Sequence, residues 1–126
     1  MSEEVLVVKD EVQRPIPTVW RQTFCQIVSS FVDHDYLLNR SIEGLVPVAQ
    51  DIADQIEIYV KDYDENLVAL PEQTWDSSVC MWMETHWDVL IDLWTETEGL
   101  SDLVLQAKVF ESKDGYKYQI EMVYVP

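Results

Sequence analysis

Apolar residues recur at helical spacing near the start of the chain. Trp20, Phe24, Ile27 and Phe31 follow one another at intervals of four, three and four residues. This spacing places the four side chains on one face of a helix. Pro17 suits the first turn of that helix, because the first turn needs no N–H donor. The pattern therefore predicts a helix from Pro17 to about residues 33–35.

A second helical repeat follows after a polar connector, which we place at residues 36–46. We expect Pro47 to open this second helix, for the same reason as in the first. The apolar face of the helix has four members: Val48, Ile52, Ile56 and Val60. Before both helices, the short apolar run 5–8 fits either an edge strand or part of a loosely docked segment that covers residues 1–14.

The last third of the chain alternates between apolar and polar residues with a period of two. Three strands with one buried face each are predicted on this pattern: residues 86–95, 102–111 and 116–125. Asp114-Gly115 is a strong hairpin signal between the last two. The acidic stretch 96–101 is predicted to be a longer hairpin tip.

The middle of the chain gives a mixed pattern. Residues 66–70 fit a short strand before Pro71. In the stretch 72–83, the spacing of Trp75, Val79 and Trp82 fits a helix, whereas every second residue from Val79 onward is apolar, as in a strand. We expect a helical turn followed by a strand at residues 78–84.

Helices followed by an antiparallel meander define an α+β domain. We expect one domain over residues 1–126, with two N-terminal helices packed on a curved sheet. A hydrophobic content of 48% is enough for a folded core at this length. Because the chain has only three glycines, few loops are expected to need a positive φ.

The charge of the chain narrows the choice of partners. Residues 62–107 hold 11 acidic residues and no lysine or arginine, and the net charge of the whole chain is −16. Such a chain repels nucleic acid and anionic membranes. It favours a basic protein partner and speeds the encounter with it. General solubility is the alternative explanation, since net charge also keeps proteins apart.

The expected compartment follows from two features that the sequence lacks, a signal sequence and a membrane-spanning run. The chain opens on Met-Ser-Glu-Glu without a signal sequence, and no apolar run approaches the roughly 18 residues that span a bilayer. We therefore expect a cytoplasmic protein.

Cys25 and Cys80 each lie in an apolar run, and we expect isolated thiols, with a single disulfide as the alternative.

No catalytic motif stands out, so we predict no enzyme, no catalytic residue, no cofactor and no metal. The run 62–66 has the oxygen ligands of a calcium loop, but Leu67 stands where that loop requires glycine. His86, Asp88 and Asp92 share one face of a predicted strand and fit a metal site or acid–base chemistry. The simpler interpretation is an exposed polar strand face.

Acidic and aromatic residues together form the strongest candidate site. With the predicted strand register, Trp82 and Trp94 share the more solvated sheet face with Asp88 and Asp92, beside the acidic tip. Tryptophan anchors and surrounding carboxylates suit a lysine- and arginine-rich protein surface. The candidate partner-binding residues are Trp82, Asp88, Asp92, Trp94, Glu96, Glu98 and Asp102. The alternative is that a helix covers both tryptophans and that the acids are ordinary surface.

The segment 87–105, which reads WDVLIDLWTETEGLSDLVL, resembles a widespread, largely uncharacterised small bacterial domain. Leu70-Pro71-Glu72 and the closing residues 115–126 also match it, so the resemblance covers roughly residues 15–126. It carries over no functional residue. In size and acidity the chain is similar to immunity proteins of contact-dependent inhibition and polymorphic toxin systems, which block a cognate, often basic, toxin. The helix ending at residues 31–36 and the later meander also resemble the nuclear-transport-factor-two-like fold.

Three functional hypotheses result. The leading one is an immunity protein that covers the active or substrate-binding surface of a basic toxin, such as a nuclease. The alternative is an α+β cone that binds a small molecule or acts as an enzyme, with a pocket near His86, Asp88 and Asp92. The third is a DNA mimic that inhibits another protein. The sequence does not decide the oligomeric state.

Overall fold

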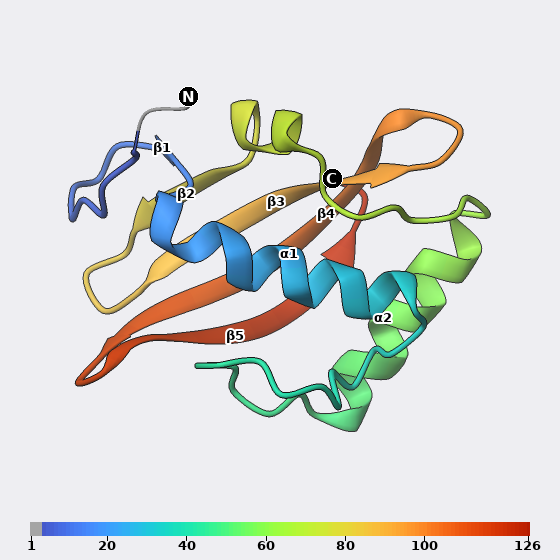
Figure 1. The fold of residues 1–126 in the computed structure, drawn as a ribbon, viewed down its shortest axis with the longest axis horizontal. Coiled ribbons are helices and arrows are strands. Elements are labelled where there is room, and N and C mark those ends of the chain that lie inside the picture. The colour runs from blue at the N-terminus through green and yellow to red at the C-terminus, as the bar shows by residue number, and fades with distance from the viewer. Residues whose placement is uncertain (1–3) are drawn as a thin grey trace.

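Two helices and a five-stranded antiparallel sheet make up the computed structural model, which describes residues 4–126. Figure 1 shows α1 crossing the sheet and α2 beside β5. The elements in chain order are β1 (Arg14–Pro15), α1 (Thr18–Val32), α2 (Gln50–Asp62), a short 3-10 helix η1 (Glu72–Asp76), β2 (Val79–Trp82), β3 (Trp87–Thr95), β4 (Gly99–Ser112) and β5 (Gly115–Tyr124). The predicted α+β class, with helices preceding the meander, is confirmed.

The core lies between the helices and one face of the sheet. On α1, Trp20 and Phe24 are fully buried, as the helical repeat predicts. The Trp20 ring meets Trp87 of β3 edge-on, with ring centroids 5.1 Å apart, and the Phe24 ring meets Tyr118 of β5 at 5.6 Å. Alternate strand residues join this one core cluster, so the opposite sheet face is left without a helix within residues 4–126.

The second helix begins later than the sequence predicts. Its N-cap is Ala49, which has an extended backbone, and its first residue is Gln50 rather than Pro47. The chain just before Pro47 is still held against β5, because the Val46 N–H donates to the Tyr118 carbonyl at 2.8 Å. This contact keeps the connector extended until it has passed the proline.

Gly44 permits the close approach of that connector to β5. It has a φ of 80°, and a Cβ atom placed on it would lie 2.5 Å from the Tyr116 carbonyl oxygen. The expectation that few loops need a positive φ is wrong, because the three glycines are not the only residues that adopt it. Four other residues also adopt positive φ: His34, Leu38, Asp64 and Glu84.

The five strands pair in the order β1-β2-β3-β4-β5, in which β2 to β5 form a meander and β1 joins it from before the helices. The β3–β4 turn is tighter than the predicted tip 96–101, because β4 already begins at Gly99 and pairs it with Thr95. A register shift between Asp92 and Trp94 absorbs the extra residues of β4. Leu103, Val104 and Leu105 are therefore buried in succession, which breaks the alternation used to place the start of this strand.

Polar side chains that precede β2 cover the edge of β3 next to the start of β2. The predicted helical turn and strand within 72–83 are confirmed as η1 and β2. Just before β2, the Ser78 hydroxyl accepts from the Asp92 N–H at 2.9 Å, and the Thr74 hydroxyl in η1 donates to the Asp92 carbonyl at 2.7 Å. The predicted strand 66–70 is only a single bridge between Leu67 and Thr95.

The N-terminal segment packs at the other end of the sheet. Of the two alternatives for residues 5–8, the edge strand is not formed, and the edge strand of the sheet is Arg14–Pro15. The segment is attached by hydrogen bonds from the Trp87 Nε1–H to the Val8 carbonyl at 3.0 Å and from the Thr18 N–H to the Val5 carbonyl. Residues 1–3 of the segment lie outside the described residues.

Both cysteines are free thiols, as expected, with Cys25 partly buried and Cys80 buried. Burial raises the pKa of the Cys80 thiol to about 11, against a smaller opposing effect of Arg14. Thiolate is the reactive form of cysteine, so Cys80 is placed for packing rather than chemistry. No helix within residues 4–126 is both long enough and apolar enough to cross a membrane.

Candidate functional site

The β3–β4 turn packs against the loop that follows α2, and this contact builds the candidate site. The Glu96 N–H donates to the Asn66 carbonyl at 2.9 Å, and the Thr97 hydroxyl donates to the Glu65 carboxylate. Two acidic segments about 30 residues apart in sequence thereby meet. We call this surface the acidic end and define it by six carboxylates: Asp62, Asp64, Glu65, Glu96, Glu98 and Asp102.

Tyr63 lies between the two segments of the acidic end. Its hydroxyl accepts a hydrogen bond of 3.0 Å from the Asp102 N–H. That N–H lowers the pKa of Tyr63, but burial and the carboxylates of Glu98 and Asp102 outweigh it, so the pKa is raised overall. The hydroxyl therefore stays protonated and remains a donor toward Glu98.

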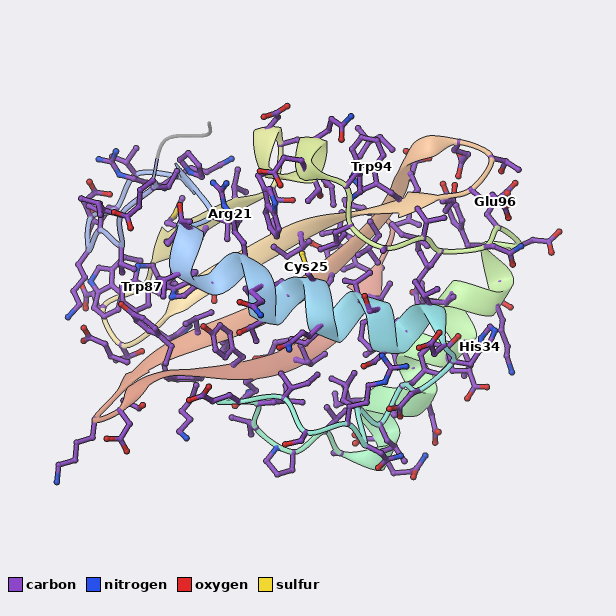
Figure 2. The ribbon with its side chains drawn as sticks, viewed as in Figure 1. Arg21, Cys25, His34, Trp87, Trp94 and Glu96 are labelled. Atoms are coloured by element: carbon purple, nitrogen blue, oxygen red, sulfur yellow. The ribbon has the colours of Figure 1, made fainter. Side chains whose placement is uncertain are left out.

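The acidic end has no free cation to offset its charge within the described residues. Lys61, which directly precedes Asp62, is already paired with Glu57, and Arg40 is paired with Asp33. The others belong to the N-terminal segment, the start of α1 and the β4–β5 hairpin: Lys9, Arg14, Arg21, Lys108, Lys113 and Lys117. In Figure 2, Glu96 and His34 lie at one end of the molecule and Trp87 at the other. The charge is therefore polarised along the molecule.

Several of the predicted site residues lie at or next to the acidic end. Glu96, Glu98 and Asp102 belong to it directly. Trp94 is their neighbour on β3 and is paired with Leu100 of β4. Asp92 joins Asp102 in lining an open hollow of about 480 Å³, together with the C-terminal Val125 and Pro126.

Asp88 is separate from this group. It lies four residues before Asp92 on β3, which is about 13 Å along an extended strand. Its carboxylate contacts His86 Nε2 at 3.0 Å, and Lys108 is its direct partner on β4. A neighbouring cation and a histidine thus surround Asp88, in contrast to the carboxylates of the acidic end.

The predicted placement of Trp82 on the solvated sheet face is wrong. Trp82 is paired directly with Trp87, and directly opposed residues of adjacent strands point to the same face. Trp87 faces the core, so Trp82 does too. The two ring centroids are 4.5 Å apart, and the Lys9 ammonium lies 5.2 Å above the Trp82 ring. The sequence fixes alternation within a strand, but not the register between strands.

The alternative site around His86 is only partly assembled. The His86 ring contacts the Thr85 hydroxyl through Nδ1 at 2.8 Å and Asp88 through Nε2. Asp92 does not join them, because its carboxylate accepts a hydrogen bond from Ser77. Within residues 4–126, no group of three or more histidine, cysteine or acidic residues is arranged to hold a metal ion.

Sequence reasoning missed half of the acidic end. The run 62–66 matches only an incomplete calcium loop, and this pattern assigns Asp62, Asp64 and Glu65 to no site. The only sequence signal was that this acidic run directly follows a helix. Its contact with the β3–β4 turn is a tertiary one, which hydrophobic periodicity does not report.

A family model described as "Domain of unknown function (DUF7668)" matches residues 28–126. The match confirms the likeness to an uncharacterised small domain, and nothing in it links the family to immunity proteins. No curated protein and no solved structure matches the chain, so the resemblance to the nuclear-transport-factor-two-like fold stays a prediction. Because the match covers most of its length, the chain belongs to this family of unknown function, DUF7668.

Proposed function

We propose that the protein binds a basic protein through its acidic end, and that it acts as an immunity protein against a cognate toxin. One observation carries the proposal: the six carboxylates of the acidic end have no free cation among them, whereas most lysines and arginines lie elsewhere. Such a one-sided field steers a basic partner into one orientation and speeds association.

Apolar residues beside the acidic end supply the burial that a stable complex needs. Leu100 is 49% exposed at the start of β4, opposite the half-buried Trp94. Val125 is also exposed and borders the hollow that contains Asp92 and Asp102. An apolar centre surrounded by charged groups is the usual anatomy of a protein–protein interface.

The proposal explains why the partner would be inhibited. A nuclease or another toxin that acts on nucleic acid holds phosphates with lysine and arginine side chains. Carboxylates that pair with those side chains occupy the positions that phosphates would take. Inhibition would then follow from occlusion, without any catalytic step in this protein.

Coexpression with the product of the gene directly upstream tests the proposal. We expect the protein to copurify with a basic C-terminal fragment of that product at a one-to-one ratio, and to restore the growth that the fragment alone prevents. If the two proteins elute separately and growth is not restored, the immunity role is wrong.

A further inference from the structure

The C-terminal ends of α1 and α2 meet at a cavity of about 560 Å³. Apolar side chains from both helices and the following loop form part of its wall: Phe31, Val32, Val60 and Leu67. Polar groups complete the wall, namely His34 and Tyr36 after α1, and Lys61, Asp64, Glu65 and Asn66 at the end of α2. The cavity is thus both partly apolar and rich in hydrogen-bonding groups.

The electrostatics of this cavity favour a cation. The C-terminal end of each helix carries a partial negative charge of about half an electron, and both α1 and α2 end here. Asp64 and Glu65 add two carboxylates. The one lysine in the wall, Lys61, already forms an ion pair with Glu57, so its charge is largely offset.

Two buried aromatic rings, Phe31 and Tyr36, support the wall of the cavity. Tyr36 stacks on Phe31, with ring centroids 5.9 Å apart and planes 26° apart. Tyr36 is only 6% exposed, and its hydroxyl contacts His34 Nδ1 at 3.3 Å. Burial and the nearby Glu57 raise the pKa of this hydroxyl, against an opposing effect of Lys61, so it remains neutral. With Asp64 and Glu65 in the wall, a guanidinium group fits better than an ammonium group, because it forms paired hydrogen bonds with carboxylates.

We propose that the cavity binds the guanidinium group of an arginine side chain of the basic partner. The inference rests on the proposed function and adds a specific anchor point to it. Glu65 connects the two surfaces, since it lines the cavity and accepts the hydrogen bond from Thr97 on the β3–β4 turn. An arginine inserted here would therefore be continuous with the contacts at the acidic end.

Titration of the ¹⁵N-labelled protein with N-acetyl-arginine amide tests the proposal. We expect saturable shifts at the backbone amides of His34, Tyr36 and Leu67. N-acetyl-citrulline amide has nearly the same shape without the charge, and we expect it to bind at least about tenfold more weakly. Shifts of equal size with both probes, or shifts that spread over all acidic residues without saturating, would overturn the proposal.

Variants separate the cavity from general surface charge. We expect Asp64→Asn with Glu65→Gln to weaken arginine binding at least about fivefold. The control, Glu72→Gln with Glu84→Gln, removes the same charge from two exposed residues outside the cavity, and should change binding less than about twofold. Equal effects of the two pairs would contradict the proposal. Asp64→Gly is a second variant for the cavity. It removes the carboxylate and should still fold, because glycine suits the positive φ of this residue.

The partner complex distinguishes the two proposals. If the cavity variants fail to bind the arginine probe and also lose affinity for the upstream gene product, both proposals gain support. If arginine does not bind the unmodified protein while the complex still forms, the cavity proposal is wrong and the proposed function stands.

Discussion

At the residue scale, two core tryptophans are equally buried but differ in whether the side-chain N–H has a hydrogen-bond acceptor. Trp20 is 0% exposed and Trp87 is 1% exposed, and their rings contact each other. The Trp87 Nε1–H donates to the Val8 carbonyl. The Trp20 Nε1–H is buried without an acceptor. Of these two tryptophans, Trp87 alone connects the core to the N-terminal segment through a side-chain hydrogen bond.

We predict that Trp87→Phe lowers the free energy of unfolding by about 1 kcal/mol more than Trp20→Phe does. Both substitutions remove the same atoms from a buried site, so the loss of packing is matched. Only the first also breaks a hydrogen bond and leaves the Val8 carbonyl without its donor. Urea denaturation of the two variants measures the difference. Equal destabilisation would show that this hydrogen bond contributes nothing net.

At the element scale, each helix is followed, two residues after its last residue, by a residue with positive φ that is not glycine. His34 follows α1 with a φ of 63°, and Asp64 follows α2 with a φ of 57°. Glycine is the usual residue at this position, because a Cβ atom makes the left-handed conformation unfavourable. Both side chains line the same cavity.

We predict that Asp64→Gly raises the free energy of unfolding by up to about 1 kcal/mol, because it relieves the left-handed backbone. Asp62→Gly is the matched control. It removes one carboxylate from the same acidic end, but it places glycine in the last turn of α2, and should destabilise by about 0.5–1 kcal/mol. Thermal and urea unfolding give both values. The prediction fails if the two variants change stability in the same direction.

Element type could be predicted from the sequence where one physical signal decided it. The helical repeat beginning at Trp20 and the alternation along β3 and β5 reflect burial of a single face, and both were confirmed. Predictions failed where a tertiary contact decided the outcome. The hydrogen bond between Val46 and Tyr118 holds the connector on β5, so α2 begins later than the sequence predicts. The register shift near Asp92 breaks the apolar–polar alternation at the start of β4, so the alternation does not predict where this strand begins.

At the scale of the whole molecule, the sequence predicted the acidic character of the site but not its composition. Glu96, Glu98 and Asp102 were identified because they lie close together around one turn. Glu65 was missed, because it reaches that turn only through the packing of the loop after α2. Trp82 was misplaced, because its face depends on the register with Trp87. Local patterns report faces and turns, whereas the site depends on contacts between distant segments.

The net charge of −16 also predicts a salt-dependent stability. Repulsion among unpaired carboxylates opposes the compact state, and salt screens it within a Debye length of about 4–5 Å near 0.5 M. We expect the Tm to rise by roughly 3–5 °C between low salt and about 0.5 M NaCl, equivalent to about 1 kcal/mol. Scanning calorimetry at the two salt concentrations measures this change in Tm. A fall in Tm would mean that surface ion pairs outweigh the repulsion.

The central claim is that the acidic end recognises a basic protein, and the association rate with the upstream gene product tests it most directly. The comparison uses the unmodified protein, a variant with Glu96→Gln, Glu98→Gln and Asp102→Asn, and a control with Glu72→Gln, Glu84→Gln and Asp114→Asn. The association rate of each of the three proteins is measured at about 20 mM and at about 150 mM salt, because physiological salt screens charges beyond about 8 Å.

We predict that the acidic-end variant associates at least about tenfold more slowly than the unmodified protein at about 150 mM salt, and that the control stays within about threefold. The rate of the unmodified protein should fall as salt rises. Equal rates for the two triple variants, or a rate that does not depend on salt, would contradict the account.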